Sequence, residues 1–160
     1  MSDSPVCCRE LPAFPEAKSP FSKLIALGWY DGPTSGVLEC DICSTAYRFE
    51  MLDQDPDWDE GLDIRIFSLS PLPTGAFAEL VEVCEEFFGS PDWPIWVLIW
   101  DFGSEAEKNQ AAQKIHQIQN RAMNPQLIVA TRSLSKELIA ARRVDWFALL
   151  GLSRRADYKD

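Results

Sequence analysis

The chain has 160 residues, of which 46% are hydrophobic and 25% are charged, and this composition is typical of a folded globular protein. Acidic residues outnumber basic ones by 25 to 15 and give a net charge of -10, which argues against a nucleic-acid-binding protein. The longest apolar run, 95–100, is far shorter than the roughly 20 residues of a membrane-spanning helix, so we expect no membrane insertion.

The N-terminal half of the sequence predicts a β-structure. Four prolines within residues 1–20 disfavour both helix and strand, so we expect an extended arm there. A first strand is predicted over 24–30, and the Asp-Gly-Pro turn that follows ends it. Alternating apolar residues and turn signals predict three more strands, at 36–40, 45–52 and 62–67, with an acidic loop at 53–61 before the last of them.

After Pro73 the apolar residues recur at helical spacing. They predict a helix ending at Phe88, with Cys84 in its buried stripe. The apolar run 95–100 indicates a central strand covered on both faces, with Trp96 and Trp100 buried together. Ser104 and Glu107 form a capping-box pattern for a helix that reaches about Met123. The remaining predicted elements are a strand at 126–131, a helix at 133–143 and an apolar turn or helix at 144–150.

These elements predict an α+β fold in a single domain. An antiparallel β-meander over about 24–70 is followed by a helix and by a βαβ-type C-terminal part, whose crossover we expect to be right-handed and parallel. We assign residues 1–20 to the arm, 21–153 to the domain and 154–160 to a tail. Residues 157–160 resemble the start of an acidic epitope tag, so we assign them no role in the fold.

Charge is distributed unevenly along the chain. Residues 25–107 carry 18 acidic and 2 basic residues, a net charge of -16, whereas residues 108–160 carry 4 acidic and 10 basic ones, a net charge of +6. The two parts could neutralise each other within the fold, or the acidic part could attract a basic protein partner.

The acidic loop is the predicted partner-binding site. Trp58 stands among acidic residues and has the composition of an interface anchor, although it could instead cover an apolar edge. The loop could also be a solvated tip, and it departs from a calcium-binding loop because Trp58 stands where the glycine should be. The predicted partner-binding residues are Trp58, Asp53, Asp55, Asp57, Asp59 and Glu60.

Cysteine provides the second candidate site. The chain has five cysteines, an odd number, and no apolar N-terminal signal, which favours a reducing compartment, the cytoplasm. Cys40-Asp41-Ile42-Cys43 has the spacing of a zinc knuckle in a hairpin, but a structural zinc needs four ligands. Cys7 and Cys8 are adjacent, and on an extended arm they would point to opposite sides. We therefore predict no metal and no other cofactor, and keep Cys40 and Cys43 as weak metal candidates beside the simpler reading of two reduced thiols.

Catalytic patterns are sparse. The sequence has no nucleophile elbow and no phosphate-binding glycine loop, and its single histidine, His116, belongs to the polar face of a predicted helix. Asp101 and Thr131 would stand at the carboxyl edge of a parallel sheet, where α/β folds bind ligands.

We expect a small acidic cytosolic protein that binds a protein with a basic surface, in a regulatory, assembly or toxin-neutralising role and without catalysis. The alternative is a metal-stabilised or enzymatic module that uses Cys40 and Cys43 or the edge at Asp101.

Overall fold

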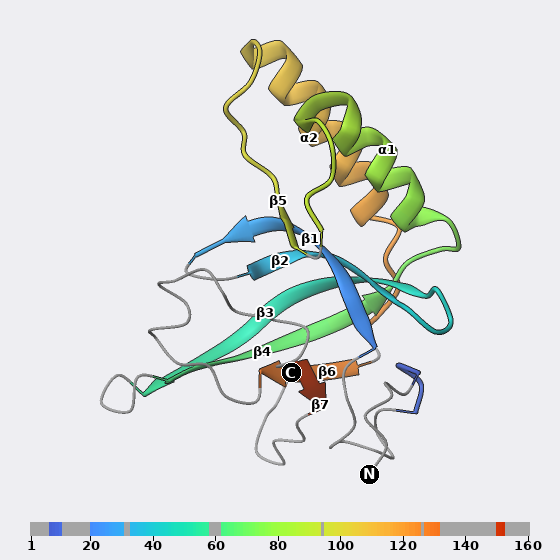
Figure 1. The fold of residues 1–160 in the computed structure, drawn as a ribbon, viewed down its shortest axis with the longest axis vertical. Coiled ribbons are helices and arrows are strands. Elements are labelled where there is room, and N and C mark those ends of the chain that lie inside the picture. Colours follow the sequence, from blue (N-terminus) through green and yellow to red (C-terminus); the bar gives the residue numbers. More distant parts are fainter. Residues whose placement is uncertain are drawn as a thin grey trace.

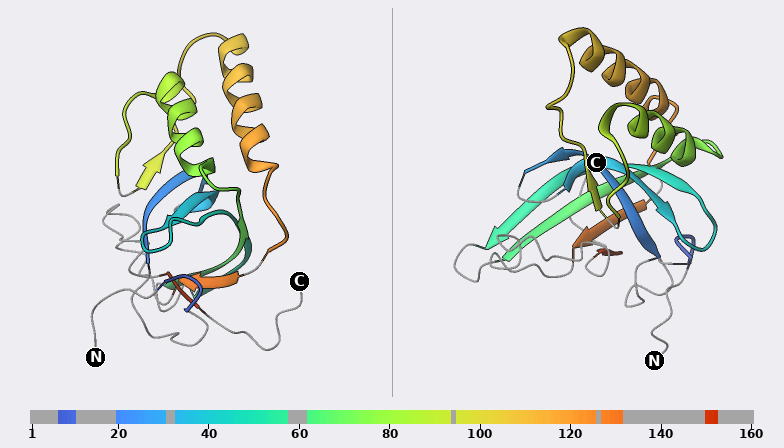
Figure 2. Two further views of the ribbon diagram at one scale, coloured as in Figure 1. Left: turned by 90° about the vertical axis from the view of Figure 1, so that its right-hand side faces the viewer. Right: turned by 45° about the horizontal axis from the view of Figure 1, so that its top comes forward.

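The computed structural model describes residues 7–10, 20–30, 33–57, 62–93, 95–125, 127–131 and 150–152. These residues form one mixed seven-stranded sheet of order β5-β1-β2-β3-β4-β6-β7, with two helices on one of its faces (Figures 1 and 2). The α+β prediction is confirmed. The strands are β1 (Phe21–Trp29), β2 (Pro33–Cys40), β3 (Ala46–Asp57), β4 (Leu62–Pro71), β5 (Ile95–Val97), β6 (Leu127–Thr131) and β7 (Leu150–Leu152).

Strands β1 to β4 form the predicted antiparallel meander, but β3 is longer than expected. The prediction of a loop at 53–61 was wrong for residues 53–57. Asp53, Asp55 and Asp57 pair in β3 with Ile66, Ile64 and Leu62 of β4, after an irregularity in register between Met51 and Asp53. Aspartate has a low intrinsic propensity for β-strands, but this propensity is weak, and pairing with an apolar neighbouring strand outweighs it here.

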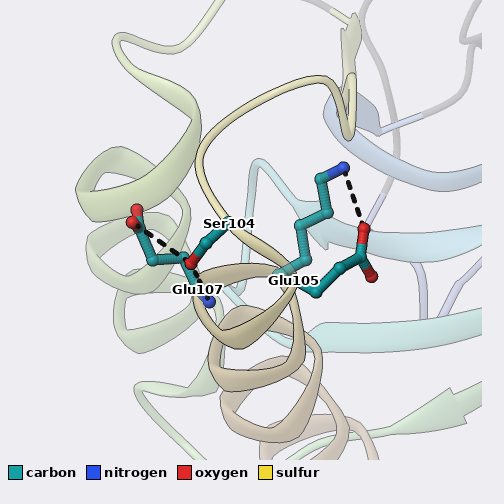
Figure 3. A network of polar contacts seen from close by, with 4 residues as sticks. Ser104, Glu105 and Glu107 are labelled. Carbon is teal, nitrogen blue, oxygen red and sulfur yellow. Dashed lines mark hydrogen bonds and ion pairs between the residues drawn. The ribbon is translucent and has the colours of Figure 1, made fainter.

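Helices α1 (Ala76–Phe88) and α2 (Glu105–Gln119) lie side by side over the sheet (Figure 1). Both match the predicted helices closely, although α2 ends four residues before Met123. The Ser104 side chain accepts a hydrogen bond from the Glu107 N–H, so the predicted N-cap is confirmed (Figure 3). Within the described residues, no helix is long and apolar enough to cross a membrane.

The sheet is buried on both faces, which divides the core into two clusters. The helix-side cluster packs Ile25 and Val37 of the sheet against Leu80 of α1 and Ile115 of α2. The arm-side cluster lies on the other face. Its members come from strands β1 to β4 and from the N-terminal arm: Cys8, Phe21, Leu24, Ala26, Leu38, Cys40, Tyr47, Phe49, Phe67 and Leu69.

Strand β5 lies at an edge of the sheet, where it pairs in parallel with β1, so the prediction of a central strand was wrong. Trp96 is buried as predicted, whereas Trp100 is only half-buried and lies three residues beyond the end of the strand. A continuous apolar run signals burial but not position in the sheet. Here the burial of Trp96 comes from the helix-side cluster.

Strands β5 and β6 have the same direction, as the predicted crossover requires, but β1, β2, β3 and β4 separate them in the sheet. Near the C-terminus, Leu150 belongs to β7, which pairs with β6, and not to the predicted apolar turn or helix. The predicted helix at 133–143 and residues 144–149 lie outside the described residues.

Candidate metal centre

The C-x-x-C sequence forms a tight turn at the end of β2. The Cys40 N–H donates to the Thr45 carbonyl over 2.9 Å, and the Ser44 N–H donates to the Cys40 carbonyl over 2.9 Å. Ser44 closes the turn with a φ of 60°, a left-handed conformation that is uncommon for residues other than glycine. Such local strain tends to be retained at functional sites, where surrounding contacts hold it in place.

The arm brings a second pair of cysteines to this turn. The chain turns at residues 7–10, where the Glu10 N–H donates to the Cys7 carbonyl over 2.8 Å. Our premise that Cys7 and Cys8 point to opposite sides was therefore wrong. It holds for an extended chain, but in a turn adjacent side chains can converge. A hydrogen bond of 2.8 Å from the Asp41 N–H to the Pro20 carbonyl also fastens the chain before β1 to the C-x-x-C turn.

The four cysteines form a cluster with the size of a metal site. The sulfur atoms of Cys7, Cys8, Cys40 and Cys43 all lie within 4.8 Å of one another. The Cys8 and Cys43 sulfurs are 3.5 Å apart. A tetrahedral zinc ion with bonds of about 2.3 Å would hold four sulfurs about 3.8 Å apart. The cluster therefore needs only small side-chain adjustments to become a tetrathiolate site.

Disulfide bonding does not explain the cluster. All five cysteines are free thiols. The separation of 3.5 Å between the Cys8 and Cys43 sulfurs is far above the roughly 2.05 Å of a disulfide bond.

Polar groups surround the sulfurs. The Cys8 N–H donates to the Cys40 sulfur over 3.5 Å, and the Tyr47 hydroxyl lies 3.2 Å from the Cys8 sulfur. The Cys43 thiol donates to the Thr45 hydroxyl over 3.2 Å. A thiolate can only accept, so ionisation of Cys43 would make the hydroxyl the donor. Such outer groups orient metal ligands and share their negative charge.

The four cysteines are buried to different extents. Cys8 and Cys40 are fully buried in the arm-side cluster, whereas Cys7 and Cys43 are half-buried and pack against it. Phe21 and Tyr47 make an edge-to-face contact within the same hydrophobic cluster. Within the described residues, solvent therefore reaches the cluster at Cys7 and Cys43 and not at Cys8 and Cys40.

The thiols differ in acidity. Hydrogen bonding from Cys8 lowers the pKa of Cys40 to about 4, against the effect of burial. The same bond, with burial, holds the pKa of Cys8 far above its usual range. Burial raises the pKa of Cys43, but hydrogen bonds with Thr45, Cys8 and Cys7 together outweigh it and the net shift is downward. Cys40 and Cys43 are therefore the thiols that ionise first, and the thiolate is the form that binds metal.

Among the residues that the structure describes, the cluster consists of the four cysteines alone. Trp58, Asp59 and Glu60 lie outside the described residues, and of Asp53, Asp55 and Asp57 the structure describes the strand pairing alone. Asp101 is exposed beyond β5, and Thr131 ends β6, so four strands separate the two strands and the predicted enzymatic edge is not assembled. His116 is exposed and Cys84 is buried, as predicted. Burial raises the pKa of the Cys84 thiol to about 12.

Sequence reasoning missed Cys7 and Cys8 as members of the site. The available signal was the number of cysteines: an adjacent pair and a C-x-x-C pair supply four sulfurs, the full ligand set of a structural zinc. Comparison of the chain with protein-family models, with curated proteins and with solved structures gives no match.

Proposed function

We propose that the protein is a zinc-stabilised domain without catalytic activity that acts by binding another protein. The observation that carries the metal part of this proposal is the convergence of four cysteine sulfurs within 4.8 Å. Two of them, Cys7 and Cys8, come from the arm, and two, Cys40 and Cys43, come from the C-x-x-C turn at the end of β2.

The donor set favours a structural zinc over a catalytic one. Four thiolates fill a tetrahedral coordination shell, whereas catalytic zinc sites keep a position open for water or substrate. A tetrathiolate site also suits iron, so the identity of the metal is part of the test. A reducing compartment such as the cytoplasm would keep the four thiols available.

Zinc in this site would fasten the arm to the sheet. Cys8 is 32 residues from Cys40 and 35 from Cys43, so one ion would close a long loop. Ordering such a segment costs conformational entropy, and an arm turn of four residues buries little apolar surface to offset it. Four metal–sulfur bonds would supply the missing free energy.

The protein-binding part of the proposal is supported by charge. Residues 25–107 carry a net charge of -16, which attracts a basic partner and speeds association. A regulatory, assembly or toxin-neutralising role fits such a surface. The binding surface that we predicted at Trp58, Asp53, Asp55, Asp57, Asp59 and Glu60 stays a proposal.

Metal analysis of protein purified without added metal or chelator tests the zinc site. We expect about one zinc per chain, and replacement by cobalt(II) should give the strong visible absorption of a tetrahedral tetrathiolate complex. Cys40→Ser and Cys8→Ser should each lower the zinc content.

Cys84→Ala is the matched control, because Cys84 is a buried cysteine that belongs to the helix-side cluster. It should keep the full zinc content. Protein that binds neither zinc nor cobalt while folded would contradict the metal site, and one iron per chain would contradict its assignment to zinc.

A further inference from the structure

Apolar side chains gather at the end of the helical layer farthest from the sheet. We call this surface the aromatic tip. It consists of Phe87 and Phe88 at the end of α1 and of Ile99, Trp100 and Phe102 in the segment that leads from β5 to α2. That segment climbs from the sheet edge past the end of α1 to the start of α2 (Figures 1 and 2).

The rings of the aromatic tip pack on one another but stay partly open to solvent. Phe88 makes edge-to-face contacts with Trp100 and Phe102, with ring centroids 4.9 Å and 4.8 Å apart. All four rings are half-buried, and Ile99 beside them is 74% exposed. A cluster of mutually packed aromatic side chains supplies a rigid apolar contact area, which is typical of binding surfaces.

The part of the chain that carries the aromatic tip is acidic in sequence. Residues 82–107 contain seven acidic residues and no lysine or arginine. Glu86 and Glu105 pair with lysines of α2, and the second pair is drawn in Figure 3. Among the described residues, Glu85 and Asp101 are exposed and form no ion pair.

The protein's own Lys114 shows how this surface holds a cation. Its ammonium group lies 5.4 Å from the centroid of the Phe87 ring and 3.2 Å from a carboxylate oxygen of Glu86. An aromatic face and a carboxylate together attract a lysine or arginine side chain. A carboxylate and aromatic rings are also neighbours in sequence farther along the chain, where the exposed Asp101 stands between Trp100 and Phe102.

We propose that the aromatic tip docks a basic segment of a partner protein that also carries an aliphatic or aromatic residue. The apolar residue would contact Ile99 and Trp100, and the basic residues would face Glu85 and Asp101. The proposal rests on the protein-binding part of the proposed function and not on the metal, since the tip lies on the helix side of the sheet. A second copy of this acidic chain fits the tip poorly, because it would bring like charges together.

Selection from a display library of random 12-residue peptides tests the proposal with the full-length protein. We expect the selected peptides to combine lysine or arginine with leucine, isoleucine or aromatic residues. Affinity for the purified peptides should fall at least fivefold in Ile99→Ala and in the double variant Glu85→Gln/Asp101→Asn. It should also weaken as salt is added. Peptide binding should shift the Trp100 indole N–H resonance.

Ile42→Ala is the matched control. Ile42 is also an exposed isoleucine, 52% accessible, but it lies in the C-x-x-C turn, away from the tip. It should leave peptide affinity unchanged, and zinc content should be the same in all variants. Selected peptides that bind Ile99→Ala as tightly as the wild type would overturn the docking site while leaving the protein-binding function standing. Selection of acidic or uncharged peptides, or of none, would overturn the proposed partner chemistry.

Discussion

The two faces of the sheet are closed by different means. On the helix side, Trp96 and the apolar stripes of α1 and α2 bury large side chains against β1 and β2. On the arm side, the corner next to β2 is closed by a four-residue turn that brings one fully buried residue, Cys8. Hydrophobic burial scales with the apolar area removed from water, and a thiol contributes little of it.

This difference indicates where the proposed zinc would contribute most to the stability of the fold. The helix-side cluster consists largely of large apolar side chains, and we expect their burial alone to stabilise it. The cysteine cluster joins segments more than 30 residues apart through thiols at contact distance, and among residues 7–10 of the arm only Cys8 is fully buried. We therefore expect the two faces to respond differently to metal removal and to core substitutions.

The largest effect should follow loss of the metal. Cys40→Ser, or treatment of the wild type with a strong zinc chelator, should lower the free energy of unfolding by roughly 4 kcal/mol or more, as losses of structural metals do. At about 2–4 °C per kcal/mol for a chain of this size, thermal unfolding should shift down by at least roughly 8 °C.

Hydrogen exchange locates the effect of metal loss. Protection should fall first at residues 7–10 and at the C-x-x-C turn, and α1 and α2 should retain theirs at moderate temperature. An unchanged melting temperature after verified zinc removal would mean that both faces are stable on packing alone.

Trp96→Ala tests the other face. Trp96 is 4% exposed and its ring contacts Trp93 edge to face at 5.9 Å. Truncation should cost about 3–5 kcal/mol, as large-to-small core substitutions do, measured by denaturant unfolding. Zinc content should not change. Loss of zinc in the folded Trp96→Ala variant would show that the two faces are not independent.

Gly36→Ala should have an intermediate effect, because β2 contributes to both clusters. A Cβ atom at Gly36 would come within 2.0 Å of the Ile25 carbonyl oxygen and 2.9 Å of the Phe49 ring. Overpacking of this kind costs about 1–3 kcal/mol through backbone and side-chain shifts. Denaturant unfolding measures it. A neutral result would mean that β1 and β2 separate more easily than their packing indicates.

The individual helices and strands could be predicted from the sequence better than the order and pairing of the strands. Helix α1 and the capped start of α2 follow from local periodicity and capping chemistry, which neighbouring residues determine. The edge position of β5 depends on which strand it pairs with, and an apolar run such as 95–100 carries no such information. The extension of β3 through Asp57 depends likewise on its pairing with β4.

The cluster of four cysteines was missed for the same reason. The C-x-x-C turn is local and was recognised, whereas the approach of Cys7 and Cys8 depends on a turn in a proline-rich arm and on its docking against Tyr47. The four prolines within residues 1–20 suggested only that this arm is extended. A count of sulfurs, taken without assuming the conformation of the arm, would have kept the four-ligand site open.

The smallest effect should come from an ion pair on the helix side. Arg121, just after α2, donates hydrogen bonds from its two terminal guanidinium nitrogens to the Glu79 carboxylate of α1. The nitrogen–oxygen distances are 2.6 Å and 3.0 Å. Arg121 lowers the pKa of Glu79 below its usual value of 4.5. A carboxyl group with a depressed folded pKa stabilises the fold above its unfolded pKa, and this contribution disappears as the pH falls through the folded pKa. Both side chains are exposed, so water weakens the pair and the effect on stability should be small.

Comparing the melting temperatures of the wild type and Glu79→Gln across pH isolates this pair, since the acid sensitivity of the cysteine site is common to both proteins. The wild type should be slightly more stable at pH 6 to pH 7. The difference should shrink as the pH falls below about 4.5, the ordinary pKa of a glutamate, and vanish once the folded Glu79 carboxyl group is protonated. Arg121→Gln should behave in the same way. A difference that persists at low pH would mean that Glu79 contributes through packing between α1 and α2 and not through its charge.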